Sequence, residues 1–210
     1  MQITLLGATG LTGQQVLRQA LEAGHDVTVL VRDPARLPQR DEPRVTVVTG
    51  DATNADDVKR AIHGSRAVIS ALGPGRDLKS PFPVLSAEAM LSAMADNPGA
   101  RVVWMSSLGA GDTARLQSVV QAAAARLLLG DLMANKGMAD KRITASGLDA
   151  TIVLPVKLTE GPRTRDYKTF DADHHVGRVG GRVSRADVAD AMLKAATSAQ
   201  QPGRRIIVAG

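Results

Sequence analysis

Glycines at a three-residue spacing are the clearest chemical signal in this chain. Gly7, Gly10 and Gly13 directly follow a short apolar run, residues 3–6, and an apolar-periodic stretch, residues 15–23, begins right after them. This order predicts a strand, a tight turn and a helix whose first N–H groups and positive dipole end face the turn. Because glycine has no Cβ, the backbone can approach a pyrophosphate closely there. The pattern therefore indicates a dinucleotide-binding turn.

Two arginines follow where a dinucleotide-binding fold contacts the ribose. Residues 27–31 predict a second buried strand, and Arg32 comes directly after it. A guanidinium pairs with a 2′-phosphate, whereas an acidic residue would bind the two ribose hydroxyls of NAD. Arg32, with Arg36 one turn later as a second donor, therefore predicts that NADP(H) is preferred over NAD(H). In the alternative interpretation, Asp33 binds the ribose and Arg32 is a solvated surface charge.

Apolar runs alternate with helical patterns along the whole chain. This alternation predicts an α/β protein with a single Rossmann-type domain over residues 1–210, built on a doubly wound, mostly parallel sheet. Further strands are expected over residues 45–48, 67–72, 101–105, 150–154 and 205–208, the second of them closed by Gly73-Pro74-Gly75. Helices are expected over residues 56–62, 83–95, 114–146, with a break near Gly130, and 184–196.

Residues 159–183 show neither a helical nor a strand period. The segment contains Gly, Pro and Arg residues together with His174 and His175, and it follows the sixth expected strand. Ligands of open α/β sheets bind at the carboxyl ends of the strands, and long irregular segments are usually functional. We therefore expect a substrate-side loop at about residues 159–183, which would also accommodate a small β-hairpin around Gly180-Gly181.

The composition limits the classes of function. The chain has a net charge of +5, 44% hydrophobic residues, 2% aromatic residues and no cysteine. Disulfides and thiolate chemistry are excluded, and no apolar run reaches the roughly 20 residues of a membrane span. So few aromatic residues provide no stacking platform for nucleic acid, and the mild positive charge suits a phosphorylated cofactor. We expect a cytoplasmic monomer or homodimer with no metal site, no membrane partner and a small-molecule substrate; nucleic acid is an unfavoured partner.

Taken together, the motifs resemble the atypical short-chain dehydrogenase/reductases. The similarity covers essentially the whole chain and is closest to the NAD(P)H-binding, NmrA-like group that includes biliverdin IX-beta reductase, also called flavin reductase. It is carried by Gly7-x-x-Gly10-x-x-Gly13, Val31-Arg32-Asp33, Gly50-Asp51, Ala71-Leu72-Gly73, Ser106-Ser107, Ser146-Gly147-Leu148-Asp149 and Ser184-Arg185-Ala186-Asp187-Val188-Ala189.

The resemblance implies a cofactor role for each matching residue. The pyrophosphate would be held by Gly7, Thr9, Gly10, Leu11, Thr12 and Gly13, and the 2′-phosphate by Arg32. Asp51 and Ala52 would lie against the adenine, and the cofactor trough would be lined by Ala71, Leu72 and Gly73. Ser106 and Ser107 would face the nicotinamide, unless they only cap the turn after their strand. Pro155, which ends the sixth strand, is counted among the cofactor-binding residues.

The chain departs from the family at the catalytic residues. Standard short-chain dehydrogenases use Tyr-x-x-x-Lys, in which the tyrosine exchanges a proton with the carbonyl. Lys136 resembles the family's lysine, but Leu132 occupies the tyrosine position and the only tyrosine is Tyr167. Lys136 would hydrogen-bond the nicotinamide ribose or, alternatively, be a solvated helix lysine. Where the biliverdin reductases carry a histidine, this chain has Lys157, which would attract an anionic acceptor.

Two functions fit these residues. The first is an NADPH-dependent oxidoreductase that transfers hydride to a flavin, a quinone or a similar conjugated acceptor, with Ser107, Lys157 and Lys136 as the catalytic residues. His174 and His175 would be proton donors from the loop, although exposed histidine pairs usually have no such role. The alternative is a catalytically weak NADP(H)-binding redox sensor or scaffold of the NmrA-like type, with which Leu132 agrees equally well.

Overall fold

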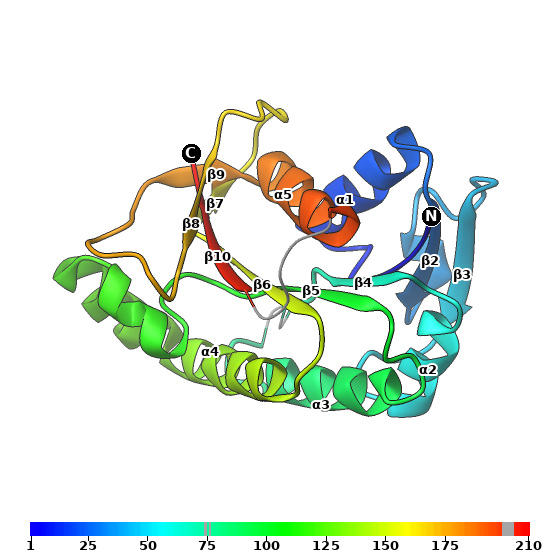
Figure 1. Cartoon of the computed structure of the whole chain (residues 1–210), viewed down its shortest axis with the longest axis horizontal. Helices are drawn as coiled ribbons and strands as arrows, with labels where there is room; N and C mark the ends of the chain where they lie inside the picture. The colour runs from blue at the N-terminus through cyan, green and yellow to red at the C-terminus, as the bar shows by residue number, and fades with distance from the viewer. Residues whose placement is uncertain (74, 76, 199–203) are drawn as a thin grey trace.

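One eight-stranded sheet organises the molecule (Figure 1). The computed structural model describes residues 1–73, 75, 77–198 and 204–210. The strand order is β3-β2-β1-β4-β5-β6-β10-β8, and each pairing is parallel except the antiparallel one between β8 and β10. The strands are β1 (Gln2–Leu6), β2 (Asp26–Val31), β3 (Val45–Thr49), β4 (Ala67–Ser70), β5 (Arg101–Met105), β6 (Ala150–Pro155), β8 (Lys168–Asp171) and β10 (Arg204–Ala209).

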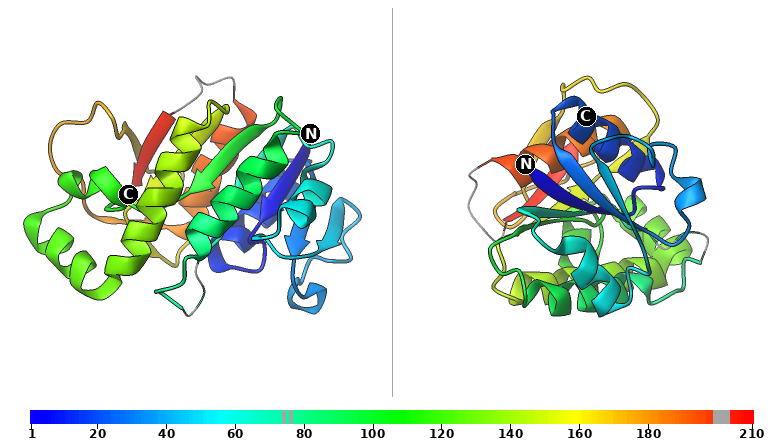
Figure 2. Two further views of the ribbon diagram at one scale, coloured as in Figure 1. Left: turned by 90° about the horizontal axis from the view of Figure 1, so that it is seen from below. Right: turned by 90° about the vertical axis from the view of Figure 1, so that its right-hand side faces the viewer.

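Helices cover both faces of this sheet, as the continuous apolar strands require. Helices α1 (Leu11–Glu22) and α5 (Arg185–Thr197) pack together on one face, and α2 (Ala55–Ile62), α3 (Phe82–Met94) and α4 (Val119–Ala145) pack on the other (Figures 1 and 2). The buried side chain of Gln19 joins the first pair by donating from Nε2 to the main-chain oxygen of Ala186 at 2.8 Å. The expected Rossmann-type α/β architecture is confirmed.

The long helix α4 is interrupted where a break was expected. Leu129, next to Gly130, has non-helical angles of φ −133° and ψ 21°. The helix begins at Val119 rather than near residue 114, because residues Gly111–Leu116 form a separate 3-10 helix, η2. Ser118 caps α4 through a hydrogen bond from the Gln121 amide, with the Gln121 side chain bonded in return. None of the helices in the described ranges is long and apolar enough to cross a membrane.

The segment after β6 contains more regular structure than the sequence indicates. Strand β7 (Lys157–Thr159) pairs in parallel with β9 (Arg182–Ser184), and β8 joins the main sheet. The hairpin suggested around Gly180-Gly181 is therefore wrong, because the partner of β9 lies before the loop rather than next to it. Pro74, in the expected strand end Gly73-Pro74-Gly75, lies outside the described residues.

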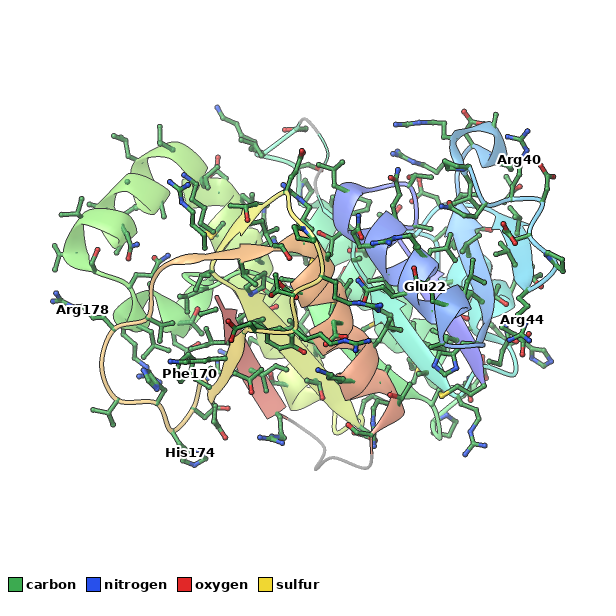
Figure 3. The ribbon with its side chains drawn as sticks, turned by 90° about the horizontal axis from the view of Figure 1, so that it is seen from above. Glu22, Arg40, Arg44, Phe170, His174 and Arg178 are labelled. Carbon is green, nitrogen blue, oxygen red and sulfur yellow. The ribbon has the colours of Figure 1, made fainter. Side chains whose placement is uncertain are left out.

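Side chains of α5 hold the first half of this segment in place. The Asp187 carboxylate accepts hydrogen bonds from the amides of Thr164 and Arg165, both at 2.8 Å. The Tyr167 hydroxyl donates to Asp190 at 2.8 Å. Figure 3 shows the segment running over α5 and out toward Phe170, His174 and Arg178. The loop is thus anchored on the sheet up to β8, and the stretch between β8 and β9 is its irregular part.

Candidate functional site

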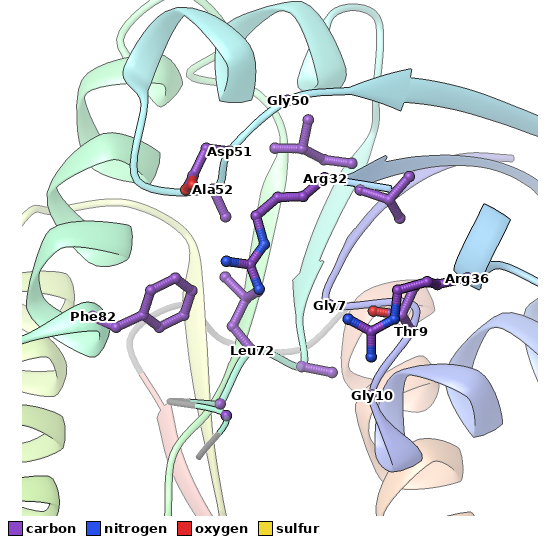
Figure 4. A pocket seen from close by; sticks show the side chains of 15 residues that line it. Gly7, Thr9, Gly10, Arg32, Arg36, Gly50, Asp51, Ala52, Leu72 and Phe82 are labelled. Carbon is purple, nitrogen blue, oxygen red and sulfur yellow. The ribbon is translucent and has the colours of Figure 1, made fainter. Parts of the chain in front are cut away.

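A cavity of about 510 Å³ opens at the carboxyl ends of β1 to β4 (Figure 4). Its lining includes ten of the residues expected to bind the cofactor: Gly7, Thr9, Gly10, Arg32, Arg36, Asp51, Ala52, Ala71, Leu72 and Gly73. No cofactor role was assigned from the sequence to five further lining residues, Leu30, Val31, Gly50, Gly75 and Phe82. Gly50 belongs to the Gly50-Asp51 motif, whereas no pattern in the sequence marks Phe82.

Close packing explains two of the glycines in the turn. Gly7 has φ +87°, and a Cβ on it would lie 2.9 Å from the carbonyl carbon of Ala71 at the end of β4. A Cβ on Gly13 would lie 2.0 Å from the main-chain oxygen of Gly7. Only glycine fits at either position without moving the backbone. The two residues therefore hold the turn against both β4 and α1.

The start of α1 is suited to an anion. Its N-cap residue is Gly10, which offers no capping side chain, and no acidic residue occupies the first turn. The N–H groups and the positive end of the dipole at this point therefore meet no competing carboxylate. Leu11, Thr12 and Gly13 lie in this first turn but do not line the cavity, and the Leu11 side chain is 57% exposed. The geometry fits a pyrophosphate held by backbone groups.

Arg32 and Arg36 extend into the cavity from the end of β2, as Figure 4 shows. Both side chains are exposed, and within the described residues neither guanidinium has a hydrogen bond or an ion pair. Asp33, the alternative ribose ligand, is engaged elsewhere: its Oδ1 accepts from the Ala35 amide at 3.0 Å and caps a short 3-10 helix, η1 (Pro34–Arg36). Two guanidinium groups are thus available to an anionic group in the cavity.

The turn after β3 is fixed by its own side chains. Asp51 Oδ1 accepts from both the amide and the hydroxyl of Thr53 at 2.8 Å. The amide of Asp51 donates to Asp57 Oδ2 at 2.7 Å, and this bond together with Arg60 holds the pKa of Asp57 below its usual value. Asp51 and Ala52 therefore present a rigid wall to the cavity where the adenine was expected.

Ser107 and Lys136 are brought together at the end of β5. Lys136 Nζ donates to Ser107 Oγ at 2.8 Å and to the main-chain oxygen of Ser106 at 3.1 Å. Burial lowers the pKa of Lys136 to about 8, while the negative charge of Asp140 acts in the opposite direction. Lys136 is only 8% exposed, so it is not a solvated helix lysine.

A small void lies next to both Lys136 and the main cavity. Lys136 lines it together with Leu72, Gly73 and Phe82, and those three residues also line the main cavity. The buried ammonium group therefore lies beside the end of the cavity remote from Arg36. Leu132, at the position of the family's tyrosine, is buried and supplies no hydroxyl there.

Ser106 is engaged behind the site rather than in it. Its Oγ donates to Asp140 Oδ2 at 2.6 Å, and both residues are buried. Burial raises the pKa of Asp140 to about 6, against the opposing effects of the Ser106 hydrogen bond and the Lys136 charge. Asp140 was not identified as a site residue from the sequence, although it lies one helical turn after Lys136.

Two expected site residues stand apart from the cavity. Lys157 is exposed on β7, and Pro155 is buried at the end of β6; neither lines the cavity. Among the loop residues, His174 pairs with Asp171 at 3.1 Å and is 86% exposed, and Tyr167 is held by Asp190, with a pKa raised to about 12 by burial. In the described parts of the chain no three metal-ligating side chains gather.

A second cavity, of about 650 Å³, lies between η2, the first half of α4 and the irregular part of the loop. Its floor is apolar, with three alanines of α4 and Met133. Arg115, Arg126 and Arg178 also line it, each from a different one of the three segments. The combination suits a ligand with an apolar body and negatively charged groups.

Comparisons with known proteins agree with this geometry. A family model of NAD(P)H-binding proteins matches residues 7–199. An uncharacterized chloroplastic protein of Arabidopsis thaliana is 32% identical over 171 residues, covering 78% of this chain and 61% of that protein. A 3-diazoavenalumate denitrifying reductase of a Streptomyces species is 30% identical over 134 residues, covering 64% of this chain and 38% of that protein. The chain thus spans less than two thirds of the length of these relatives.

Solved structures share the fold over the whole chain. ChuY, an anaerobillin reductase from Escherichia coli O157:H7, superposes with a TM-score of 0.83 at 25% identity, covering 100% of this chain and 97% of that one. A short-chain dehydrogenase/reductase from Veillonella parvula, solved in complex with NADP, also superposes with a TM-score of 0.83, at 21% identity, covering 100% and 94%. The second likeness concerns the fold alone.

Proposed function

The chain belongs to the NAD(P)H-binding family of atypical short-chain dehydrogenase/reductases, and we propose that it reduces a flavin, a quinone or a similar conjugated acceptor with NADPH. One observation carries the proposal. The buried Lys136, hydrogen-bonded to the half-buried Ser107, lies beside one end of a cavity that Arg32 and Arg36 enter with no side-chain partner among the described residues. A nicotinamide dinucleotide with a 2′-phosphate has the charge to pair with the two arginines and the length to reach from them to the Lys136–Ser107 pair.

The chain's residues would hold the cofactor at two points. Backbone N–H groups at the start of α1 bind the pyrophosphate, and Gly7 and Gly13 permit that approach. Arg32, with Arg36 beside it, binds the 2′-phosphate through charge-assisted hydrogen bonds. Asp33 is given no role at the ribose in this proposal, because its Oδ1 accepts from the Ala35 amide and caps η1. NADPH is therefore expected to bind more tightly than NADH.

Catalysis depends on positioning and electrostatics. Reduced nicotinamide, when bound, supplies the hydride. Ser107, oriented by the hydrogen bond from Lys136, positions the acceptor, and the ammonium charge of Lys136 stabilises negative charge that develops on it. A flavin or quinone can take its protons from water, so the missing tyrosine hydroxyl at Leu132 is not required. Lys157 attracts anionic acceptors from the exposed β7 rather than touching them.

The second cavity, which is lined by Arg115, Arg126 and Arg178, is the proposed place for the acceptor. Gly109 of its lining lies two residues after Ser107, and Met133 lies one helical turn before Lys136, so chain neighbours of both proposed catalytic residues line this cavity. Its apolar floor would bury a ring system, and Arg115, Arg126 and Arg178 would bind acidic substituents or a phosphate. The similarity to a reductase, ChuY, supports reduction as the reaction class.

The test is to mix the protein with NADPH and FMN, or with a quinone, and to follow the absorbance of the reduced nicotinamide. Turnover that needs both Ser107 and Lys136 is expected, so Ser107→Ala and Lys136→Met should lose it while retaining the bound cofactor. Lys141→Gln, an exposed lysine on the same helix, is the matched control and should keep full activity. No oxidation above background with any of these acceptors would overturn the reductase proposal.

Leu132 favours a second candidate, an NADP(H)-binding redox sensor or scaffold. A buried leucine replaces the group that transfers a proton in standard members of the family. This candidate predicts NADP(H) binding without turnover, together with a different affinity for the oxidised and the reduced cofactor. The turnover assay distinguishes the two functions, and calorimetric titration with NADP+ and NADPH measures the preference that a sensor needs.

A further inference from the structure

Asp140 is a buried acidic group that the proposed reaction does not use. It is 6% exposed, and only one of its two carboxylate oxygens has a hydrogen-bond partner among the described residues: Oδ2 accepts from Ser106 Oγ at 2.6 Å, and Oδ1 has none. A buried carboxylate oxygen without a partner costs free energy. Such a group calls for an explanation within the fold.

A third cavity leads to this carboxylate from outside the cofactor site. Its volume is about 630 Å³, and Asp140, Gly111, Gly137, Asp173 and Arg205 are among its lining residues. None of its lining residues belongs to the cavity that Arg32 and Arg36 enter. Solvent can therefore approach Asp140 without passing the cofactor.

Two glycines bring the walls of this cavity close together. A Cβ on Gly137 would lie 2.7 Å from Gly111 Cα, and Gly111 itself has φ +55°. The close contact sets α4 directly against η2, one residue after Lys136. The helix that carries both Lys136 and Asp140 is thus held at a fixed distance from the turn after β5.

Ser106 bonds both ionisable groups. Its main-chain oxygen accepts from Lys136 Nζ at 3.1 Å, and its hydroxyl donates to Asp140. Lys136 and Asp140 are one helical turn apart, a spacing at which side chains of a helix are neighbours. The carboxylate favours the charged form of the lysine, and the lysine favours that of the carboxylate.

Other charged groups near Asp140 are already balanced or exposed. Arg205, on β10, donates to Asp112 at 2.6 Å and is also bonded to Asp173. Lys141 lines the same cavity and is exposed to solvent. Lys136 is therefore the buried cation whose charge depends on Asp140.

We propose that Asp140, in the wall of this third cavity, is a positioning residue that keeps Lys136 charged and bound to Ser107. Burial alone would drive the ammonium group to release its proton, and the adjacent carboxylate opposes that release. The consequence for catalysis rests on the proposed reductase function, but the coupling between the two side chains does not.

The coupling can be measured on the protein without cofactor. The Lys136 side-chain signal is followed by carbon NMR as a function of pH and is assigned by its absence from Lys136→Met. In Asp140→Asn, which keeps the shape but not the charge, the midpoint of the Lys136 titration should fall by about one pH unit or more. Lys141→Gln, a charge change in the same cavity, should leave that midpoint in place. An unchanged midpoint in Asp140→Asn, or a shift of equal size in Lys141→Gln, overturns the proposal.

Two further measurements keep the proposal testable if Asp140→Asn does not fold. Asp140→Glu restores the charge, so its Lys136 midpoint should stay near that of the unchanged protein. In the unchanged protein, the Lys136 signal should also show a smaller second inflection where the Asp140 carboxyl ionises, a pH that infrared spectroscopy of that carboxyl gives directly. Absence of the inflection counts against the coupling. If the coupling is observed but NADPH is never oxidised, only the reductase function fails.

Discussion

Ser107 Oγ and Lys136 Nζ are 2.8 Å apart although 29 positions separate the two residues in the chain. This hydrogen bond joins the end of β5 to the middle of α4, at the edge of the cofactor cavity. Because the ammonium group is buried, its protonation depends on pH within the range where enzymes are assayed.

Activity should fall as the pH rises through about 8, because Lys136 loses its proton there. The folded-state pKa is below the ordinary 10.5, so the charged lysine is available only at lower pH. Lys136→Arg, whose guanidinium stays charged, should remove this alkaline limb even if the maximal rate is lower. The measurement is the rate of NADPH oxidation across pH 6 to about 10 at saturating acceptor. A limb that persists in Lys136→Arg assigns the titration to another group.

Arg32→Ala should weaken NADPH binding by on the order of 2 kcal/mol, about 30-fold, and change NADH binding little. The variant removes a guanidinium that has no partner among the described residues and that enters the cavity. Calorimetric titration with each cofactor measures the difference. Arg40→Ala, an exposed arginine of the same segment outside the cavity lining, is the matched control. Equal losses for both cofactors would show that Arg32 does not bind the 2′-phosphate.

Gly13→Ala should destabilise the protein by about 1–3 kcal/mol and lower its affinity for cofactor. The added methyl would lie 2.0 Å from the main-chain oxygen of Gly7, so the turn and α1 must move apart. Gly99→Ala places a methyl with nothing within 4 Å and serves as the control. Thermal unfolding and NADPH titration of both variants check the prediction. A Gly13→Ala protein as stable as the control would mean that the turn relaxes at no cost.

Asp140→Asn should gain stability relative to the unchanged protein as the pH rises from about 4 to above 6. Burial raises the pKa of Asp140 from 3.8 to about 6, so the folded protein binds a proton that the unfolded chain has already lost. Stability contributed by the neutral carboxyl is therefore lost across this window, by about 3 kcal/mol in all.

Denaturant unfolding of both proteins at several pH values gives this difference. Carboxylates such as Asp112, Asp171 and Asp187 have pKa values lowered by their partners, so their contribution to the stability rises with pH. Both proteins share this contribution, and it therefore cancels in the difference. A difference that does not change with pH would mean that Asp140 is ionised in the folded protein at every pH tested.

Local spacing made the cofactor half of the site predictable. The glycine turn, the strand that ends at Val31 and the arginines after it lie within 36 residues of the N-terminus, and each follows from neighbours in sequence. The break in α4 was likewise indicated by Gly130, next to the irregular Leu129. Where a glycine or an apolar period decides the structure, the sequence contains the information.

The remainder depends on contacts between distant segments. Strands β7 and β9 have three residues each and pair across a gap of more than 20 residues, so neither has a recognisable period of its own. The burial of Lys136 and Asp140 depends on the packing of η2 against α4, which the spacing of residues within the helix does not reveal. Phe82 lines the cavity because it is the first residue of α3 and this helix begins beside the cavity.

Because β7 pairs with β9, the strands before and after the irregular part of the loop stay in contact even where the chain between them is cut. A cut between β8 and β9 would leave one fragment with β1 to β8 and another with β9, α5 and β10. The second fragment would still pair with β7, β6 and β8, and α5 would still pack on α1. We therefore expect a protein cut at this point to stay assembled as two pieces, one holding the glycine turn and Lys136 and the other closing the sheet.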